Sequence, residues 1–262
     1  MKRIHLFELE DQWWFPTTFR NPLTDALQFS IMAFQLYEPI VPHIKRVMQH
    51  MNSTQIIDLC SGASGPWLQL QAQLALEQYP ISVTLTDKYP NIRAFEKTSK
   101  LSKNHIHYIA ESIDATNVPA YLKGVRTMFT GFHHFQPDLA KAILQNAVDQ
   151  RVAIGIFEFT KRCLRNLFLT PIITPLAVLL TTPLIRPISF TRFFWTYGIP
   201  VVPLAISWDS IVSNLRTYCP LELEKLVGSI KNTDYIWEIG YAVSPRTKMI
   251  TITYLLGYPQ FP

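Results

Sequence analysis

Short apolar runs separated by amphipathic stretches make up the middle of this chain. Five of these runs end in polar or small residues, which is typical of strands buried in a parallel sheet. They occupy residues 55–60, 82–86, 105–109, 124–130 and 152–159, and helical patterns lie between them at 66–79, 90–100 and 137–150. Two later strand patterns, 235–243 and 249–256, flank a turn sequence, Ser244-Pro245-Arg246-Thr247. We therefore predict an α/β fold: a doubly wound, seven-stranded, mostly parallel sheet with an antiparallel terminal hairpin.

The pattern is less regular before the first strand and after the fifth. Residues 1–52 predict an N-terminal helical cap, in which Pro22 marks a turn before a helix from Asp25 to Tyr37. Residues 53–262 hold the sheet, interrupted by an apolar insertion at 163–206. Amphipathic helical patterns follow this insertion at 207–218 and 221–228.

The insertion contains almost no charge. Between Asn166 and Trp208 the only charged residues are Arg186 and Arg192. Prolines at positions 171, 175 and 183 interrupt the run, and a proline removes a helical hydrogen bond that lipid cannot replace. We therefore expect short helices joined by turns rather than a membrane-spanning helix. Residues 166–206 would then be a lid or a contact with a membrane surface.

Composition narrows the class of protein. With 48% hydrophobic and 16% charged residues, the chain is too apolar to be disordered. Its net charge of +5 comes from thinly spread Lys and Arg, which argues against a nucleic-acid partner. Three scattered cysteines predict neither a disulfide framework nor a metal site. Acidic residues at positions 8, 10 and 11 interrupt any secretory signal, so we expect a cytoplasmic protein, with membrane association through 166–206 left open.

Polar residues gather where the predicted strands end. In open α/β sheets this edge, near the first strand and its neighbour, binds ligands. After the first strand comes Asp58-Leu59-Cys60-Ser61-Gly62-Ala63-Ser64-Gly65, with glycines that let a ligand approach the backbone. The second strand ends at Asp87, an acid able to accept from both hydroxyls of a ribose. The third strand is followed by Asp114, and the fourth by Gly131-Phe132-His133-His134-Phe135.

In these motifs the sequence resembles the class I S-adenosylmethionine-dependent methyltransferases. The similarity covers roughly residues 55–159 and the late hairpin. The segment 58–65 is similar to the family's first motif, although Cys60 stands where glycine is usual. The resemblance implies a Rossmann-like methyltransferase domain over 53–262 and a donor site for S-adenosylmethionine. That site would comprise Asp58, Ser61, Gly62, Gly65, Asp87, Lys88, Ser112, Asp114, Ala115 and Thr130.

Each of these side chains also has a plain structural interpretation. Asp58 could cap the turn after its strand, Asp87 could be the N-cap of the next helix, and Asp114 could be a solvated loop residue. The resemblance also implies that an N-terminal helical segment covers the donor, in which case Arg20 or Tyr37 could reach the donor's carboxylate.

Three residues are candidates for catalysis: His133, His134 and Glu158. The segment Thr130–Phe135 is similar to the family's fourth motif, in which many small-molecule methyltransferases carry paired histidines. A histidine there would serve as the base for an acceptor hydroxyl, amine or acidic carbon. The alternatives are loop histidines held by backbone and a Glu158 that pairs with Lys161 or Arg162.

The leading hypothesis is methyl transfer from S-adenosylmethionine to a small, apolar or lipid-like acceptor, because the apolar insertion falls where this family places substrate-covering elements. An RNA or protein methyltransferase is the second hypothesis, although no basic appendage is present. A non-catalytic, membrane-associated binding protein is the third. A dinucleotide-dependent oxidoreductase is disfavoured, since only Gly62 and Gly65 stand in the loop where three spaced glycines are expected.

Overall fold

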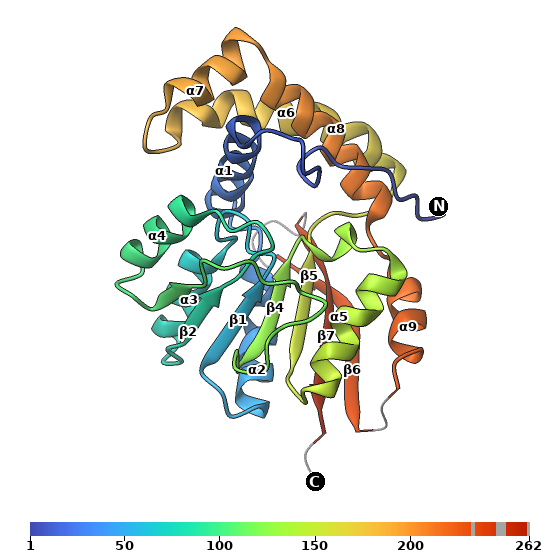
Figure 1. Cartoon of the computed structure of the whole chain (residues 1–262). Coiled ribbons are helices and arrows are strands. Elements are labelled where there is room, and N and C mark those ends of the chain that lie inside the picture. Colours follow the sequence, from blue (N-terminus) through green and yellow to red (C-terminus); the bar gives the residue numbers. More distant parts are fainter. Residues whose placement is uncertain (232–233, 245–249, 261–262) are drawn as a thin grey trace. The chain divides into compact units, whose positions relative to one another are not determined.

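The chain divides into two compact units (Figure 1). In the computed structural model, residues 1–231, 234–244 and 250–260 are described. The sheet unit comprises Gln35–Phe159 and Cys219–Pro262, and the helical unit comprises Met1–Phe34 and Thr160–Tyr218. These boundaries differ from the expected 1–52 and 163–206, because residues 35–52 belong with the sheet and residues 207–218 belong with the N-terminal segment.

The sheet unit confirms the predicted seven strands. They are β1 (Gln55–Leu59), β2 (Ser82–Leu85), β3 (Ile106–Tyr108), β4 (Val125–Phe129), β5 (Ile154–Glu158), β6 (Tyr235–Val243) and β7 (Thr251–Pro259). Their order is β3-β2-β1-β4-β5-β7-β6. Only β7 runs against its neighbours β5 and β6, so six strands share one direction and the terminal hairpin is antiparallel. Of the expected hairpin turn, residues 245–247 lie outside the described part of the chain.

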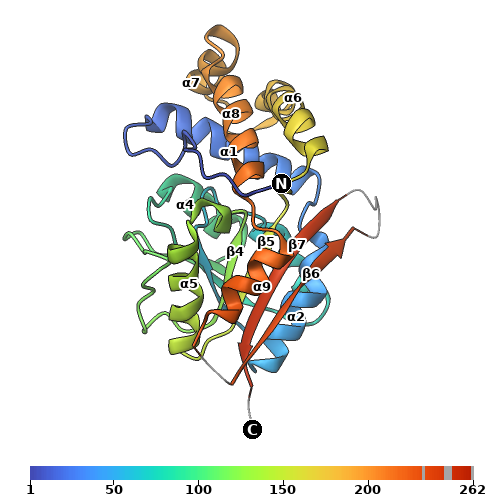
Figure 2. The same cartoon turned by 90° about the vertical axis from the view of Figure 1, so that its right-hand side faces the viewer.

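Helices cover both faces of this sheet. They are α2 (Val41–His50), α3 (Trp67–Leu76), α4 (Ile92–Leu101), α5 (Pro137–Asp149) and α9 (Pro220–Gly228). Figure 2 shows the strands between α2 on one side and α5 on the other. In α2, buried Val41, Ile44, Val47 and Met48 recur at helical spacing and turn one face toward the sheet. The carboxyl ends of β1 and β4 lie side by side at the point where the strand order reverses.

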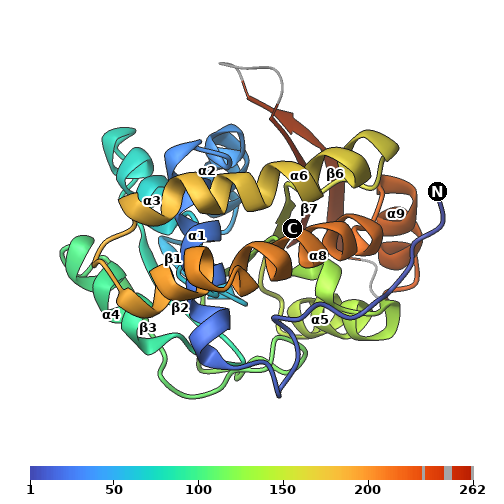
Figure 3. The ribbon, with the colours of Figure 1, turned by 90° about the horizontal axis from the view of Figure 1, so that it is seen from above.

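The helical unit is built from α1 (Thr17–Ala33), α6 (Leu164–Thr181), α7 (Phe190–Phe193) and α8 (Val201–Arg216). Figure 3 shows α6 and α8 side by side. Their shared core with α1 consists of Phe15, Leu23, Ala26, Val178, Ile185, Val202, Ala205 and Ile206. The N-terminal residues pack on α8, where Asp209 accepts the backbone N–H of Leu9 at 2.7 Å.

Proline positions misled the sequence prediction in this unit. Pro171 and Pro175 lie inside the continuous helix α6, and Pro22 lies inside α1, which begins eight residues before the expected start at Asp25. At Pro175, a tertiary contact explains why α6 continues. Pro175 has no N–H to donate to the carbonyl of Pro171, and the hydroxyl of Ser207 on α8 donates to it instead, at 2.8 Å. The helix therefore continues where local rules predict a break.

Candidate active site

Unusual backbone conformations mark the carboxyl ends of β1 and β4. Left-handed φ angles occur at Cys60 (+55°), Gly62 (+53°), Ser64 (+83°), Gly65 (+51°) and Thr130 (+47°). For a residue with a side chain this conformation costs about 1–2 kcal/mol, and it is least expected for a β-branched threonine. Such residues concentrate at binding sites, where the surrounding structure holds them in place. Because β1 and β4 are paired neighbours, the structure brings the predicted first and fourth motifs together.

Asp58 holds this loop in place. Its Oδ2 accepts the hydroxyl of Ser61 at 2.6 Å, and its Oδ1 accepts the hydroxyl of Thr127, on β4, at 2.7 Å. Burial raises the pKa of Asp58 to about 7, although the two hydroxyls act against this shift. Both carboxylate oxygens are therefore engaged within the sheet unit. Asp58 is also only 1% exposed, whereas Asp87 is partly exposed. Burial together with these bonds gives Asp58 a positioning role beneath the loop, closer to the structural interpretation than to direct ligand contact.

Asp87 is hydrogen-bonded to the same loop. Its Oδ2 accepts the backbone N–H of Gly62 at 2.8 Å, and its Oδ1 accepts the N–H of Tyr89 at 2.8 Å. A carboxylate has about four acceptor positions, two on each oxygen. Each oxygen of Asp87 uses one of them, so each keeps one for a further donor such as a ribose hydroxyl. Asp87 is thus oriented by backbone, and it does not act as the N-cap of α4, a role that Asn91 fills by accepting from Ala94 at 3.2 Å.

Open space adjoins the glycines of the loop. A Cβ built on Gly62 or on Gly65 would meet nothing within 4 Å. Side chains at these positions would fill that space, whereas glycine leaves it free for a ligand. Asp87, for which the sequence predicts ribose binding, therefore lies next to a loop with space for a ligand.

The loops after β2 and β3 are joined into one ledge. The backbone N–H of Ile113 donates to the carbonyl of Asp87 at 2.9 Å, and the hydroxyl of Ser112 donates to the carbonyl of Lys88 at 2.7 Å. The ammonium of Lys88 lies 3.5 Å from a carboxylate oxygen of Asp114. These contacts bring the loop that carries Asp114 next to the loop that carries Asp87.

Asp114 is also engaged by its own turn. Its Oδ1 accepts the hydroxyl of Thr116 at 2.6 Å and the N–H of Thr116 at 2.8 Å. The hydroxyl of Thr116 is the main cause that lowers the pKa of Asp114, and Lys88 adds to it. The carboxylate of Asp114 is thus ionised at neutral pH. The next residue, Ala115, is buried.

Tyr37 supports the strained end of β4. Its hydroxyl is hydrogen-bonded to the hydroxyl of Thr130, and its ring meets Phe129 edge-on with centroids 4.9 Å apart. Burial holds the pKa of Tyr37 well above its usual range, so the phenol stays neutral. The neutral phenol keeps its proton for the hydrogen bond with the hydroxyl of Thr130. Arg20, the other residue considered for the donor's carboxylate, donates to the carbonyls of Glu10 at 3.0 Å and Gln12 at 2.6 Å.

Glu158 and His133 form a buried pair. The carboxylate of Glu158 accepts the N–H groups of Phe132 at 2.8 Å and His133 at 3.1 Å through Oε1, and Nδ1 of His133 lies 2.8 Å from Oε2. Burial raises the pKa of Glu158, but the charge and hydrogen bonds of His133 outweigh it, so that the pKa is lowered overall. An ionised carboxylate only accepts hydrogen bonds, so Nδ1 carries the proton and Nε2 of a neutral ring has a lone pair.

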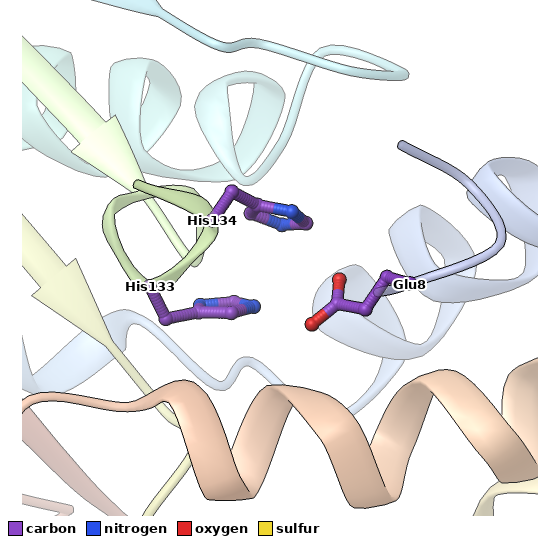
Figure 4. A group of neighbouring side chains, drawn as sticks. All are labelled: Glu8, His133 and His134. Carbon is purple, nitrogen blue, oxygen red and sulfur yellow. The ribbon is translucent and has the colours of Figure 1, made fainter. Parts of the chain in front are cut away.

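His134 lies against His133. Figure 4 shows the two rings projecting from one turn, and their centroids are 4.3 Å apart with planes tilted by 31°. The three candidate catalytic residues are therefore neighbours in the sheet unit. Glu158 bonds to the turn that carries the histidines, a partner that the sequence analysis did not consider beside Lys161 and Arg162.

Sequence reasoning missed Thr127, which holds Asp58, and the pairing of Tyr37 with Thr130. A signal for Thr127 does exist. The fully buried strand β4 reads Val125-Arg126-Thr127-Met128-Phe129, and a polar residue in such a strand calls for a partner. Tyr37 gives no comparable signal, because its partner lies 93 residues away.

No protein-family model matches this sequence, and no curated protein matches it. Solved structures do match. An O-methyltransferase family protein from Burkholderia thailandensis aligns with 90% of this chain at a TM-score of 0.50 and 14% identity. A putative O-methyltransferase from Nostoc punctiforme aligns with 90% of it at 0.50 and 13%. In each case the match spans 59% of the other protein's length.

The methyltransferase domain of bacterial CtHen1 is matched over its whole length. It aligns with 86% of this chain and 100% of the domain, at a TM-score of 0.50 and 11% identity. At such identities the likeness concerns the fold.

Proposed function

We propose that this chain, which has the fold of the class I S-adenosylmethionine-dependent methyltransferases, binds that donor and methylates a small, apolar or lipid-like acceptor. The observation that carries the proposal is the position of Asp87. It stands at the carboxyl end of β2, is fixed by the N–H of Gly62, and keeps an acceptor position on each oxygen beside open space.

Different residues of the sheet unit would hold different parts of the donor. Asp87 would accept the ribose hydroxyls, the Gly62–Gly65 loop would follow the ribose and the amino-acid end, and the ledge of Lys88, Ser112, Asp114 and Ala115 would border the adenine. Asp58 and Ser61 would keep the loop in its left-handed conformation from below. When bound, the donor supplies an electrophilic methyl group, so the chain has to align the acceptor and manage its proton.

His133 is the candidate for taking that proton. Its Nδ1–H is fixed on Glu158, which leaves Nε2 as the basic atom and stabilises the positive charge that the ring gains on protonation. This pair suits an acceptor with a hydroxyl group. Two of the matched structures are described as O-methyltransferases, which supports the same interpretation.

The apolar nature of the acceptor is supported by composition. Residues 166–206 carry only two charges, both arginines, and the resemblance places substrate-covering elements at this point of the chain. An apolar molecule would gain most from such a surface, at roughly 25 cal/mol for each Å² removed from water.

The test is transfer of a radiolabelled methyl group from S-adenosylmethionine to extracted lipids and other apolar metabolites. Label in the organic phase is expected, with a loss of about 10²- to 10⁴-fold in His133→Gln. His107→Gln, which changes an exposed histidine on β3, is the matched control and should keep full activity. Label recovered only in RNA or protein would favour the alternative acceptors, and donor binding without any transfer would favour a non-catalytic protein.

A further inference from the structure

The helical unit exposes a continuous apolar face on α6. Leu164, Phe168, Ile172, Leu176, Leu180 and Leu184 follow one another at four-residue spacing from α6 into the turn after it, and each is at least half exposed. The 18 residues of α6 extend over about 27 Å. Exposed apolar patches of this extent mark contacts with proteins or membranes.

Hydroxyl groups donate to backbone carbonyls of α6. The hydroxyl of Thr170 donates to the carbonyl of Asn166, and that of Thr174 to the carbonyl of Thr170, both at 2.8 Å. The carbonyl that Pro175 leaves without its helical donor accepts the hydroxyl of Ser207 on the neighbouring helix α8. A hydroxyl donor such as Ser207 allows a proline inside a helix surrounded by lipid, because hydrocarbon offers no replacement hydrogen bond.

The charges of the segment that carries this face have one sign. Residues 160–208 contain five basic residues and no acidic residue. Lys161 and Arg165 are exposed at the start of α6, and Arg186 is exposed just beyond its end, whereas Arg192 is buried against Asp25. Exposed aromatic side chains, including Phe190, Tyr197 and Trp208, belong to the same unit. Basic ends, an apolar middle and aromatic rings together complement the interface of a bilayer that contains anionic lipids.

We propose that this apolar face of α6 binds the surface of an anionic phospholipid bilayer. By length and composition Leu164–Leu184 could also cross a membrane, as could the segments Phe190–Gly198 and Val201–Arg216 taken together. The remaining sides of α6 favour a surface position. Val178 lies in the core shared with α1 and α8, and α8 itself carries a buried Asp209 and a buried Arg216, which are costly inside hydrocarbon.

The test is flotation of the full-length protein with vesicles of phosphatidylcholine, with or without phosphatidylglycerol. We expect binding that strengthens with phosphatidylglycerol and weakens with salt. Leu176→Gln should lower the partition coefficient roughly tenfold. The control Leu139→Gln changes a leucine of α5 that is equally exposed, 51% against 52%, and should leave binding within about twofold. Arg165→Gln should lose roughly fivefold on the anionic vesicles alone.

Several results would overturn the proposal. They are absence from the floated fraction, equal losses in Leu176→Gln and Leu139→Gln, and vesicle-bound protein that resists high salt and alkaline carbonate, which would indicate a spanning helix. A concentration-dependent dimer that Leu176→Gln abolishes, without vesicle binding, would identify a second copy as the occupant. Because this assay needs neither donor nor acceptor, its outcome is separate from that of the proposed methyl transfer.

Discussion

Replacing Glu158 by glutamine tests the proposed base without changing the size of the side chain. A glutamine has one end that accepts and one that only donates. If its NH₂ faced the N–H groups of Phe132 and His133, two donors would lose their acceptor, at about 1–3 kcal/mol each. If the NH₂ faces Nδ1 of His133, the ring can move its proton to Nε2, and the N–H groups of Phe132 and His133 keep their acceptor. The second arrangement is therefore favoured.

The expected consequence is a histidine in the wrong tautomer. Nε2 would carry the proton, so His133 could not accept one from the acceptor, and methyl transfer should fall about 10²- to 10⁴-fold. Loss of the charged acceptor should also lower the free energy of unfolding by about 1–3 kcal/mol. Donor affinity should remain within a factor of about two, because Glu158 bonds to the histidine turn and not to the loop at Gly62.

The assay is ¹⁵N NMR of histidine-labelled protein, with the His133 signals assigned from His133→Gln. We expect Nδ1–H in the wild type and Nε2–H in Glu158→Gln. Nε2–H in the wild type, or an unchanged tautomer in the variant, would refute the assignment of His133 as base. A tautomer that changes while transfer stays at the wild-type rate would show that the reaction needs no base at this position.

Two further predictions concern the supporting structure. The pKa of Asp58 is about 7 in the folded protein, against 3.8 in an unperturbed side chain. Between about pH 4 and 7 the folded state therefore binds a proton that the unfolded state has lost. The free energy of unfolding should decrease as the pH rises through this range, by at most about 4 kcal/mol. Asp58→Asn, which can still bond to Ser61 and Thr127, should remove this pH dependence from urea unfolding measured at several pH values; an unaltered pH profile would contradict the argument. Ser207→Ala should lower the free energy of unfolding by about 1 kcal/mol, because the carbonyl of Pro171 loses its donor; an unchanged thermal midpoint would show that this hydrogen bond does not support α6.

The sheet unit is predictable from sequence because its signals are local. A buried parallel strand carries a short apolar run with a polar end, and the pattern at 235–243 predicts β6 with the bounds observed. The same logic places Asp58, Asp87 and His133 at strand ends, where the sheet brings them to one edge. What each carboxylate bonds to is not local. Thr127, which engages Asp58, is 69 residues away in the chain.

The helical unit is less predictable for the same physical reason. A proline in a helix is costly as long as the carbonyl four residues earlier has no donor, and sequence rules assume that case. In α6 the donor is Ser207, 36 residues away from Pro171. In α1, Leu23 and Ala26, which follow Pro22, are buried with Phe15 in the core of the helical unit, a packing that the local sequence does not reveal.

The most direct measurement of the central claim is isothermal titration of the purified protein with S-adenosylmethionine. The wild type is expected to bind the donor. Asp87→Ala should weaken this binding by about 1–3 kcal/mol, because the ribose hydroxyls lose their acceptor, and Asp149→Ala, on the exposed surface of α5, should leave it unchanged. If the wild type gave no heat of binding at high micromolar donor, the protein would not be a donor-binding methyltransferase. Equal affinities of the wild type and Asp87→Ala would remove Asp87 from the donor site.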